Sequence, residues 1–291
     1  MRVAWRLGLA AAITAALIVV QLLAAHVAHS SSLIADAGHN LVDLASLVLA
    51  WFAARVALRP PNAQRTWGHD RANILAALTS ASVLVLVTIA VTILAIMRLI
   101  HPGVVHPTPL LIAAGLGLLG NIFAAYLLHD HNGELNQRSA RLHLLGDAGA
   151  SAAVLLAGLG ILLWGSAASR LDPLATLLVA GLLVREGVKM IRESTEILLE
   201  ASPKGLDSLE LRQWLLESPD IEEVHDLHLW SLGGLRHAMS AHLVVDEQIS
   251  LSQCNALAES LRAELGQRFG HVHATFEFEG RGCAEHVDRH E

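Results

Sequence analysis

Six long apolar segments in the first 200 residues constrain the fold of this chain more than any other feature. Each has about the 20 residues that an α-helix needs to cross a lipid bilayer. They lie near residues 7–25, 32–54, 73–97, 108–129, 141–164 and 173–192. Only 16% of the 291 residues are charged, against about 25% in an average soluble protein. The sequence therefore predicts a membrane domain of six transmembrane helices.

Basic residues are unequally divided between the two ends of these segments. One side has only Arg98 and Arg170, whereas the joints on the other side carry Arg2, Arg6, Arg55, Arg59, Arg65, Arg71, Arg138, Arg141, Lys189, Arg192 and Lys204. Because cytoplasmic loops are enriched in Lys and Arg, this asymmetry predicts that both termini face the cytoplasm. A cleaved secretory signal is the alternative for the first segment, but its apolar run exceeds the usual length of about 7–15 residues and five more segments follow.

The residues after Pro203 have the composition of a soluble domain. The pattern predicts helices over 206–217 and 251–268, and strands over 221–232, 236–245 and 271–279. In the last strand apolar side chains alternate with polar ones, which is typical of a half-buried strand. We therefore expect a membrane domain over residues 1–202 and an α-β-β-α-β, ferredoxin-like α+β cytoplasmic domain over residues 203–291.

Two histidine–aspartate pairs with the same spacing lie inside apolar segments, His39 with Asp43 and His143 with Asp147. Residues four apart share a helix face, so each pair directs an imidazole and a carboxylate to one side. An ionisable group near the bilayer centre costs roughly 2.5–3.5 kcal/mol on insertion scales and usually marks an ion path. Two nitrogens and two oxygens form a four-ligand set suited to Zn²⁺. A zinc site between two membrane helices is the resulting prediction.

Other candidates lie outside the membrane segments. The polar face of the predicted tail sheet carries His242, His273 and Glu279, while His69 and Asp70 lie in a short polar loop that is more simply a solvated turn. The chain has two cysteines, too few for a disulfide framework, which favours a reduced compartment for the tail. No basic stripe indicates a nucleic-acid partner.

Several motifs together resemble one known family. They are Ser32-Leu-Ile-Ala-Asp-Ala-Gly-His-Asn-Leu-Val-Asp43, Gly68-His-Asp-Arg71, Leu142-His-Leu-Leu-Gly-Asp147, Asp172-Pro173, Val224-His-Asp-Leu-His-Leu-Trp-Ser-Leu232 and Ser240-Ala-His242. With these motifs the chain resembles the cation diffusion facilitators, which are metal–proton antiporters. The resemblance implies a transport site at His39, Asp43, His143 and Asp147. It also implies a tail metal site at His225 and His242, with His273 and Glu279 as later-strand candidates, and a homodimer whose tails meet.

The predicted function is export of Zn²⁺ from the cytoplasm in exchange for protons, by alternating access around the four ligands. Cd²⁺ and Co²⁺ stay open as substrates, while the absence of thiolate ligands argues against Cu(I). We expect no enzyme activity and no cofactor, and we expect the inner (cell) membrane of a bacterium as the location. One alternative is a membrane zinc sensor that signals through its tail without transport. The other is a metallohydrolase, which would need an open zinc position and a separate general base.

Overall fold

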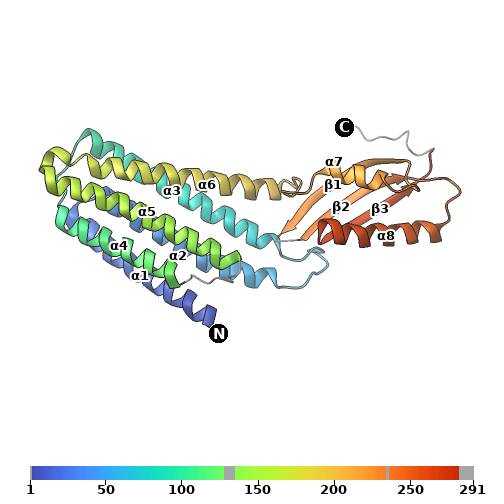
Figure 1. Ribbon diagram of the computed structural model, residues 1–291, viewed down its shortest axis with the longest axis horizontal. Helices are drawn as coiled ribbons and strands as arrows, with labels where there is room; N and C mark the ends of the chain where they lie inside the picture. Colours follow the sequence, from blue (N-terminus) through green and yellow to red (C-terminus); the bar gives the residue numbers. More distant parts are fainter. Residues whose placement is uncertain (1, 128–134, 234–235, 282–291) are drawn as a thin grey trace. The chain divides into compact units, whose positions relative to one another are not determined.

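The computed structural model describes residues 2–127, 135–233 and 236–281 (Figure 1). Six long helices fill the first 200 residues. They are α1 (Arg2–Ala28), α2 (Ser31–Ala57), α3 (Arg71–Ile100), α4 (Pro107–Leu127), α5 (Leu135–Trp164) and α6 (Leu171–Leu198), with the short 3₁₀ helix η1 (Gly165–Ala168) before α6. Each of the six long helices contains or closely overlaps one predicted apolar segment. The prediction of a helical membrane-type domain is confirmed.

Four of these helices are long and apolar enough by themselves to cross a bilayer, namely α2, α3, α4 and α5. In α1, the part of the chain that the structure describes contains a shorter apolar stretch, Ala15–Ala28. The second half of α6 carries Arg185, Glu186, Lys189 and Arg192, which lower its apolar character. The number of crossings therefore stays a prediction.

The helices form one compact unit, over residues 1–51 and 76–191, whose side chains are arranged as in a membrane protein. Helix α4 packs against both α1 and α5. Small residues make these contacts close: a Cβ atom at Gly120 of α4 would lie 2.7 Å from Leu17 Cδ1 of α1. Large apolar side chains such as Leu86, Leu119 and Leu156 point outward and are more than 60% exposed. Small residues inside and large apolar residues outside are what a lipid environment favours.

The carboxylate of Asp172, at the start of α6, closes the N-terminus of α2. It accepts hydrogen bonds from the Ser31 amide (2.9 Å), from the Ser31 hydroxyl (2.8 Å) and from the hydroxyls of Ser30 and Ser32 (both 2.5 Å). The first amides of a helix lack intrahelical partners, and a negative charge beside them is stabilised by the helix dipole. Asp172 therefore holds α2 and α6 together and is not free to bind metal.

A second unit comprises residues 52–75 and 192–291. It contains α7 (Ser208–Leu216), β1 (Glu223–Gly233), β2 (Arg236–Val244), α8 (Leu251–Phe269) and β3 (Val272–Glu279). The sheet has the order β1-β2-β3, with β1 antiparallel and β3 parallel to β2. The predicted α-β-β-α-β order is confirmed. Helix α7 begins two residues later than predicted because Asp207 is its N-cap, accepting a hydrogen bond from the Leu209 amide at 2.9 Å.

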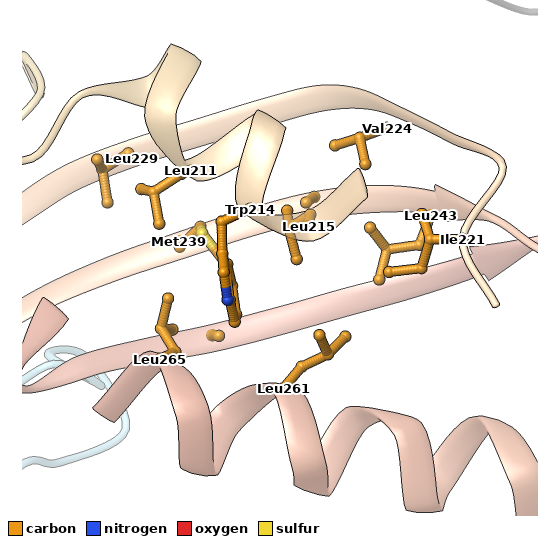
Figure 2. Packing of buried hydrophobic residues seen from close by; sticks show 12 residues of the cluster. Leu211, Trp214, Leu215, Ile221, Val224, Leu229, Met239, Leu243, Leu261 and Leu265 are labelled. Atoms are coloured by element: carbon orange, nitrogen blue, oxygen red, sulfur yellow. The ribbon is translucent and has the colours of Figure 1, made fainter. Parts of the chain in front are cut away.

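The two helices and the sheet share one apolar core. Figure 2 shows Trp214 of α7 and Leu261 and Leu265 of α8 pointing toward Met239 and Leu243 of β2. All five are at least 95% buried. Because alternate residues of a strand face opposite sides, packing Met239 and Leu243 into this core turns His242 to the other face. The core thus fixes which side of the sheet carries the polar residues.

Candidate metal centres

The first cluster lies in the helical unit, between α2 and α5. His39 Nε2 is 3.3 Å from Asp43 Oδ2 on its own helix and 3.2 Å from Asp147 Oδ1 of α5. His39 and Asp147 are each only 6% exposed. One donor atom from each of the three residues lies within 4.8 Å of the others, a spacing that allows all three to bind one metal ion. The structure thus brings together residues that are more than a hundred positions apart.

His143 is the fourth predicted ligand, and its side chain lies outside the described residues. Its backbone is in α5, four residues before Asp147. The role of His143 as a ligand stays a prediction.

Mostly apolar side chains share a small cavity with His39. The cavity is lined by α2, α3 and α6 through Ala35, Leu84, Val87, Thr88, Val91, Ala180 and Leu183. Charged groups in such surroundings are costly unless another charge compensates them. A divalent cation or protons would supply that compensation for Asp43 and Asp147. The cluster is therefore suited to hold either.

The second cluster lies on the polar face of the tail sheet. His225 of β1 pairs directly with His242 of β2, and their ring centroids are 5.4 Å apart. Glu279 of β3 reaches both, with Oε1 at 2.7 Å from His242 Nδ1 and Oε2 at 3.3 Å from His225 Nε2. These three residues also offer donor atoms within 4.8 Å of one another. Two imidazoles and a carboxylate form a plausible zinc ligand set.

Sequence reasoning did not single out Asp226, which adjoins this second cluster. Its Oδ2 is 3.4 Å from His242 Nε2, and its Oδ1 is 2.7 Å from His228 Nε2. Strand β1 has an irregular register between His225 and His228, and Asp226 adopts a positive φ of 48° there. Bulges of this kind re-aim a side chain, so the simple alternation of a strand does not predict where Asp226 points. The only signal in the sequence is its place between two histidines.

Three predicted candidates are not brought into either cluster. His273 stands on β3 opposite Ala238, with its ring 5.2 Å from that of Trp67. It precedes Glu279 by six residues, which is about 20 Å along a strand. Asp70 accepts a hydrogen bond from the Arg236 guanidinium, and His69 Nε2 lies 2.9 Å from Arg65 Nη1. An arginine thus lies beside each of these two loop residues, and their role as accessory metal ligands stays a prediction.

Shifted pKa values in the tail belong to residues that are not members of the metal cluster. Burial lowers the pKa of His237, which favours its neutral form. A hydrogen bond from Arg281 lowers the pKa of Glu222 and raises that of Arg281 itself. These groups belong to the packing and surface of the tail, and the Arg281 guanidinium pairs with Glu222.

Comparison with known proteins identifies relatives over nearly the whole chain. The model of the cation efflux transmembrane domain matches residues 7–199, and that of the cation efflux protein cytoplasmic domain matches residues 203–280. The chain is 35% identical over 281 residues to the zinc transporter ZitB of Escherichia coli (strain K12), covering 96% of this chain and 88% of that protein. It is 32% identical over 264 residues to the cadmium, cobalt and zinc/H(+)-K(+) antiporter of Bacillus velezensis, covering 90% and 83%. It is also 32% identical to the zinc transporter ttm-1 of Caenorhabditis elegans, covering 92% and 69%.

Proposed function

Because the chain belongs to the cation diffusion facilitator family of cation efflux proteins, we propose that it exports Zn²⁺ from the cytoplasm in exchange for protons. The observation that carries the proposal is the cluster of His39, Asp43 and Asp147 between two apolar helices, in which His39 and Asp147 are buried. The names of the relatives support zinc as the substrate and a proton-coupled mode. His143 completes the proposed site as a fourth ligand.

Ligand chemistry explains how metal and protons exchange at one place. A zinc ligand must be deprotonated, so protons compete with the ion for the same nitrogen and oxygen atoms. When the site opens to the side richer in protons, protonation of His39 and the carboxylates releases the ion. When it opens to the cytoplasm, zinc displaces the protons. Alternating access around a site at membrane depth is the mode of secondary transporters.

The donor set favours zinc over other ions. Imidazole and carboxylate ligands in a four-coordinate arrangement suit Zn²⁺, whereas a set of oxygens alone would favour Mn²⁺ or Mg²⁺. Cd²⁺ and Co²⁺ are further candidate substrates, and the described site contains no thiolate that would favour Cu(I). The protein acts as a transporter, with zinc as its cargo rather than a resident cofactor.

The tail is proposed to bind zinc as a regulator and to join two copies of the chain. His225, His242 and Glu279 hold the metal, and the match to a cytoplasmic dimer-type domain over residues 203–280 supports the homodimer. We further propose that the membrane domain ends at residue 202. It would cross the membrane six times with both termini in the cytoplasm. The membrane would be the inner membrane of a bacterium. Basic residues on the cytoplasmic side support that orientation.

The experiment is a flux assay with the purified full-length chain in sealed lipid vesicles. An imposed pH gradient should drive zinc across the membrane, as reported by a zinc-sensitive dye on the far side. Asp147→Ala should abolish the flux, while Glu186→Ala, which changes an exposed acid of α6, should not. Zinc binding by the wild-type chain without any flux would instead favour the sensor alternative.

A further inference from the structure

A third buried carboxylate lies one helical turn from the membrane cluster and is not part of it. Asp36 of α2 is only 1% exposed and precedes His39 by three residues. Its Oδ2 accepts a hydrogen bond from Gln21 Nε2 of α1 at 2.5 Å and from Ser151 Oγ of α5 at 3.3 Å. Gln21 Oε1 in turn accepts one from Asn40 Nδ2 at 3.0 Å. A buried polar network thus joins three helices beside the metal cluster.

This network repeats the α2–α5 contact of the metal cluster at the next turn. His39 meets Asp147 at one level, and Asp36 meets Ser151 at the level beside it. Ser151 follows Asp147 by four residues, so both residues of α5 face α2. One turn of helix separates the two levels by about 5.4 Å. Asp36 is therefore close enough to be influenced by the charge at the metal cluster without binding the metal.

The hydrogen bonding of Asp36 is incomplete in a way that leaves room for a proton. Its Oδ1 is buried and has no hydrogen-bond partner among the described residues, nor do these include an arginine or lysine paired with it. A charged carboxylate in this position has uncompensated charge, which favours protonation. The two donors on Oδ2, Gln21 and Ser151, favour the charged form. Opposing influences of this kind allow both states to be populated.

The charged groups that face Asp36 belong to the metal cluster. They are His39 on its own helix and Asp147 on α5. The residues that α1, α4 and α5 place against the network itself are neutral, namely Gln21, Gly117 and Ser151. Zinc bound at the cluster favours the Asp36 carboxylate, because an opposite charge stabilises the charged form. Departure of zinc leaves the Asp147 anion uncompensated, which favours a proton on Asp36.

We propose that Asp36 is a proton-carrying residue of the exchange cycle, which takes up a proton when zinc leaves and releases it when zinc binds. The proton exchanges with water on the side to which the site is open and rests on Oδ1. This inference depends on the proposed zinc–proton exchange and adds to it a proton that is not bound to any metal ligand. Zinc and this proton then do not compete for the same ligand atoms. Instead, the positive charge of bound zinc disfavours the proton on Asp36.

The test compares the number of protons moved per zinc ion by wild-type chain and by Asp36→Asn in sealed vesicles. Two dyes inside the vesicles report pH and zinc together, so metal bound outside by the tail does not enter the ratio. Asparagine keeps an oxygen acceptor for Gln21 and Ser151 but cannot take up a proton. We expect the variant to transport zinc with about one proton fewer per ion, since metal binding and proton release are linked. An unchanged ratio would overturn the inference while leaving the exchange itself intact.

Two further variants separate proton carriage from a structural role. Ser151→Ala removes one hydrogen-bond donor to Asp36 and leaves its carboxyl group in place. We therefore expect the wild-type number of protons per zinc ion. We also expect the pH dependence of flux to shift to higher pH, because the lost hydrogen bond favoured the charged carboxylate. If Asp36→Asn does not transport at all, Asp36→Glu, which restores a titratable carboxyl, should recover flux. Failure of both variants to transport would assign Asp36 to helix packing and refute the inference. Absence of proton movement in the wild-type chain would instead refute the proposed function.

Discussion

The two metal clusters both combine histidine with carboxylate side chains, but they differ in secondary structure and in exposure to solvent. In the helical unit, His39 and Asp147 are 6% exposed and come from helices joined only through the packing of the membrane domain. In the tail, the side chains of His225, Glu279 and His242 are 9%, 14% and 28% exposed and lie on three neighbouring strands of a small sheet. The helical cluster has its own partly exposed member, Asp43 at 23%, but its Asp147 is more buried than the tail carboxylate Glu279. Water therefore compensates charge less well at Asp147 than at the tail cluster when no metal is bound.

This difference in solvation separates the two proposed roles. A buried set of anions must be filled by metal or by protons, which is the requirement for an exchanger. The tail set has only one carboxylate, and that carboxylate is more exposed than Asp147, so the set can be empty at a smaller cost and its occupancy can follow the cytoplasmic zinc concentration. Coupling to transport then requires that metal bind one arrangement of the tails better than another.

Removal of Asp147 should give the largest effect and is the strongest test of the buried cluster. Loss of even an outer-shell partner lowers metal affinity by roughly 10–100-fold, and Asp147→Ala removes a proposed ligand itself. We expect transport to fall below detection while zinc binding by the tail of the same chain is unchanged. Flux in sealed vesicles and calorimetry on the full-length protein measure the two quantities.

The control for that prediction is Glu186→Ala, which removes an exposed acid of α6 and should leave both quantities unchanged. Near-normal zinc flux in Asp147→Ala would contradict the assignment of the buried cluster as the transport site.

His39→Asp should change the choice of metal more than the rate. The substitution replaces a borderline imidazole nitrogen with a hard oxygen and leaves a set richer in carboxylates, which suits Mn²⁺ better than Zn²⁺. We therefore expect the ratio of zinc to manganese flux to fall. His237→Asp, at a tail histidine outside both clusters, is the matched control. If His39→Asp transports with the wild-type ratio, His39 is not a ligand of the transported ion.

Local patterns in the sequence predicted most of the fold because each one follows from burial. Apolar runs locate the six helices, and the alternation of Val272, Ala274, Phe276 and Phe278 locates β3. The spacing of His39 and Asp43 predicts a shared helix face. That these two residues form one site with Asp147 of α5 is implied by the family motifs. The approach of Asp147 to His39 itself depends on how two distant helices pack, which spacing within one helix does not determine.

The features that were not predicted all depend on contacts between distant segments. Asp226 joins the tail cluster because a bulge interrupts β1, and His273 is separated from Glu279 along β3 although both share its polar face. In the sequence, Asp36 is a single acidic residue among apolar neighbours, and only the structure shows that Gln21 and Ser151 donate hydrogen bonds to it. Alternation within one strand or helix carries no information on such neighbours.

His242→Ala should weaken zinc binding by the tail and reduce transport without abolishing it. Its Nδ1 lies 2.7 Å from Glu279 Oε1, so its removal takes away one of the three proposed ligands and leaves only His225 and Glu279. In a chain that also carries Asp147→Ala, calorimetry isolates the tail, and we expect a loss of affinity greater than about 100-fold. His273→Ala is the control, because His273 lies away from the cluster. Equal zinc binding by the wild-type and His242→Ala tails would contradict a metal site at His242 and leave dimerisation as the role of the tail.

Asp226→Asn should give the smallest effect, and its size distinguishes two roles for this residue. His242 Nδ1 lies on the Glu279 side of the ring, and Nε2 lies 3.4 Å from Asp226 Oδ2. A metal held together with Glu279 would therefore take Nδ1 and leave Nε2 to donate its hydrogen toward Asp226. A carboxylate in that position orients the ring and makes the opposite nitrogen a better ligand. Asparagine keeps an acceptor oxygen but loses the charge, so we expect tail affinity to fall by about 10-fold, the low end for such partners. Calorimetry in the Asp147→Ala chain measures it, with Asp207→Asn as the control for loss of an exposed carboxylate. A loss as large as that of His242→Ala would mean that Asp226 binds the metal directly, and the tail site would then draw its ligands from both sides of the His242 ring.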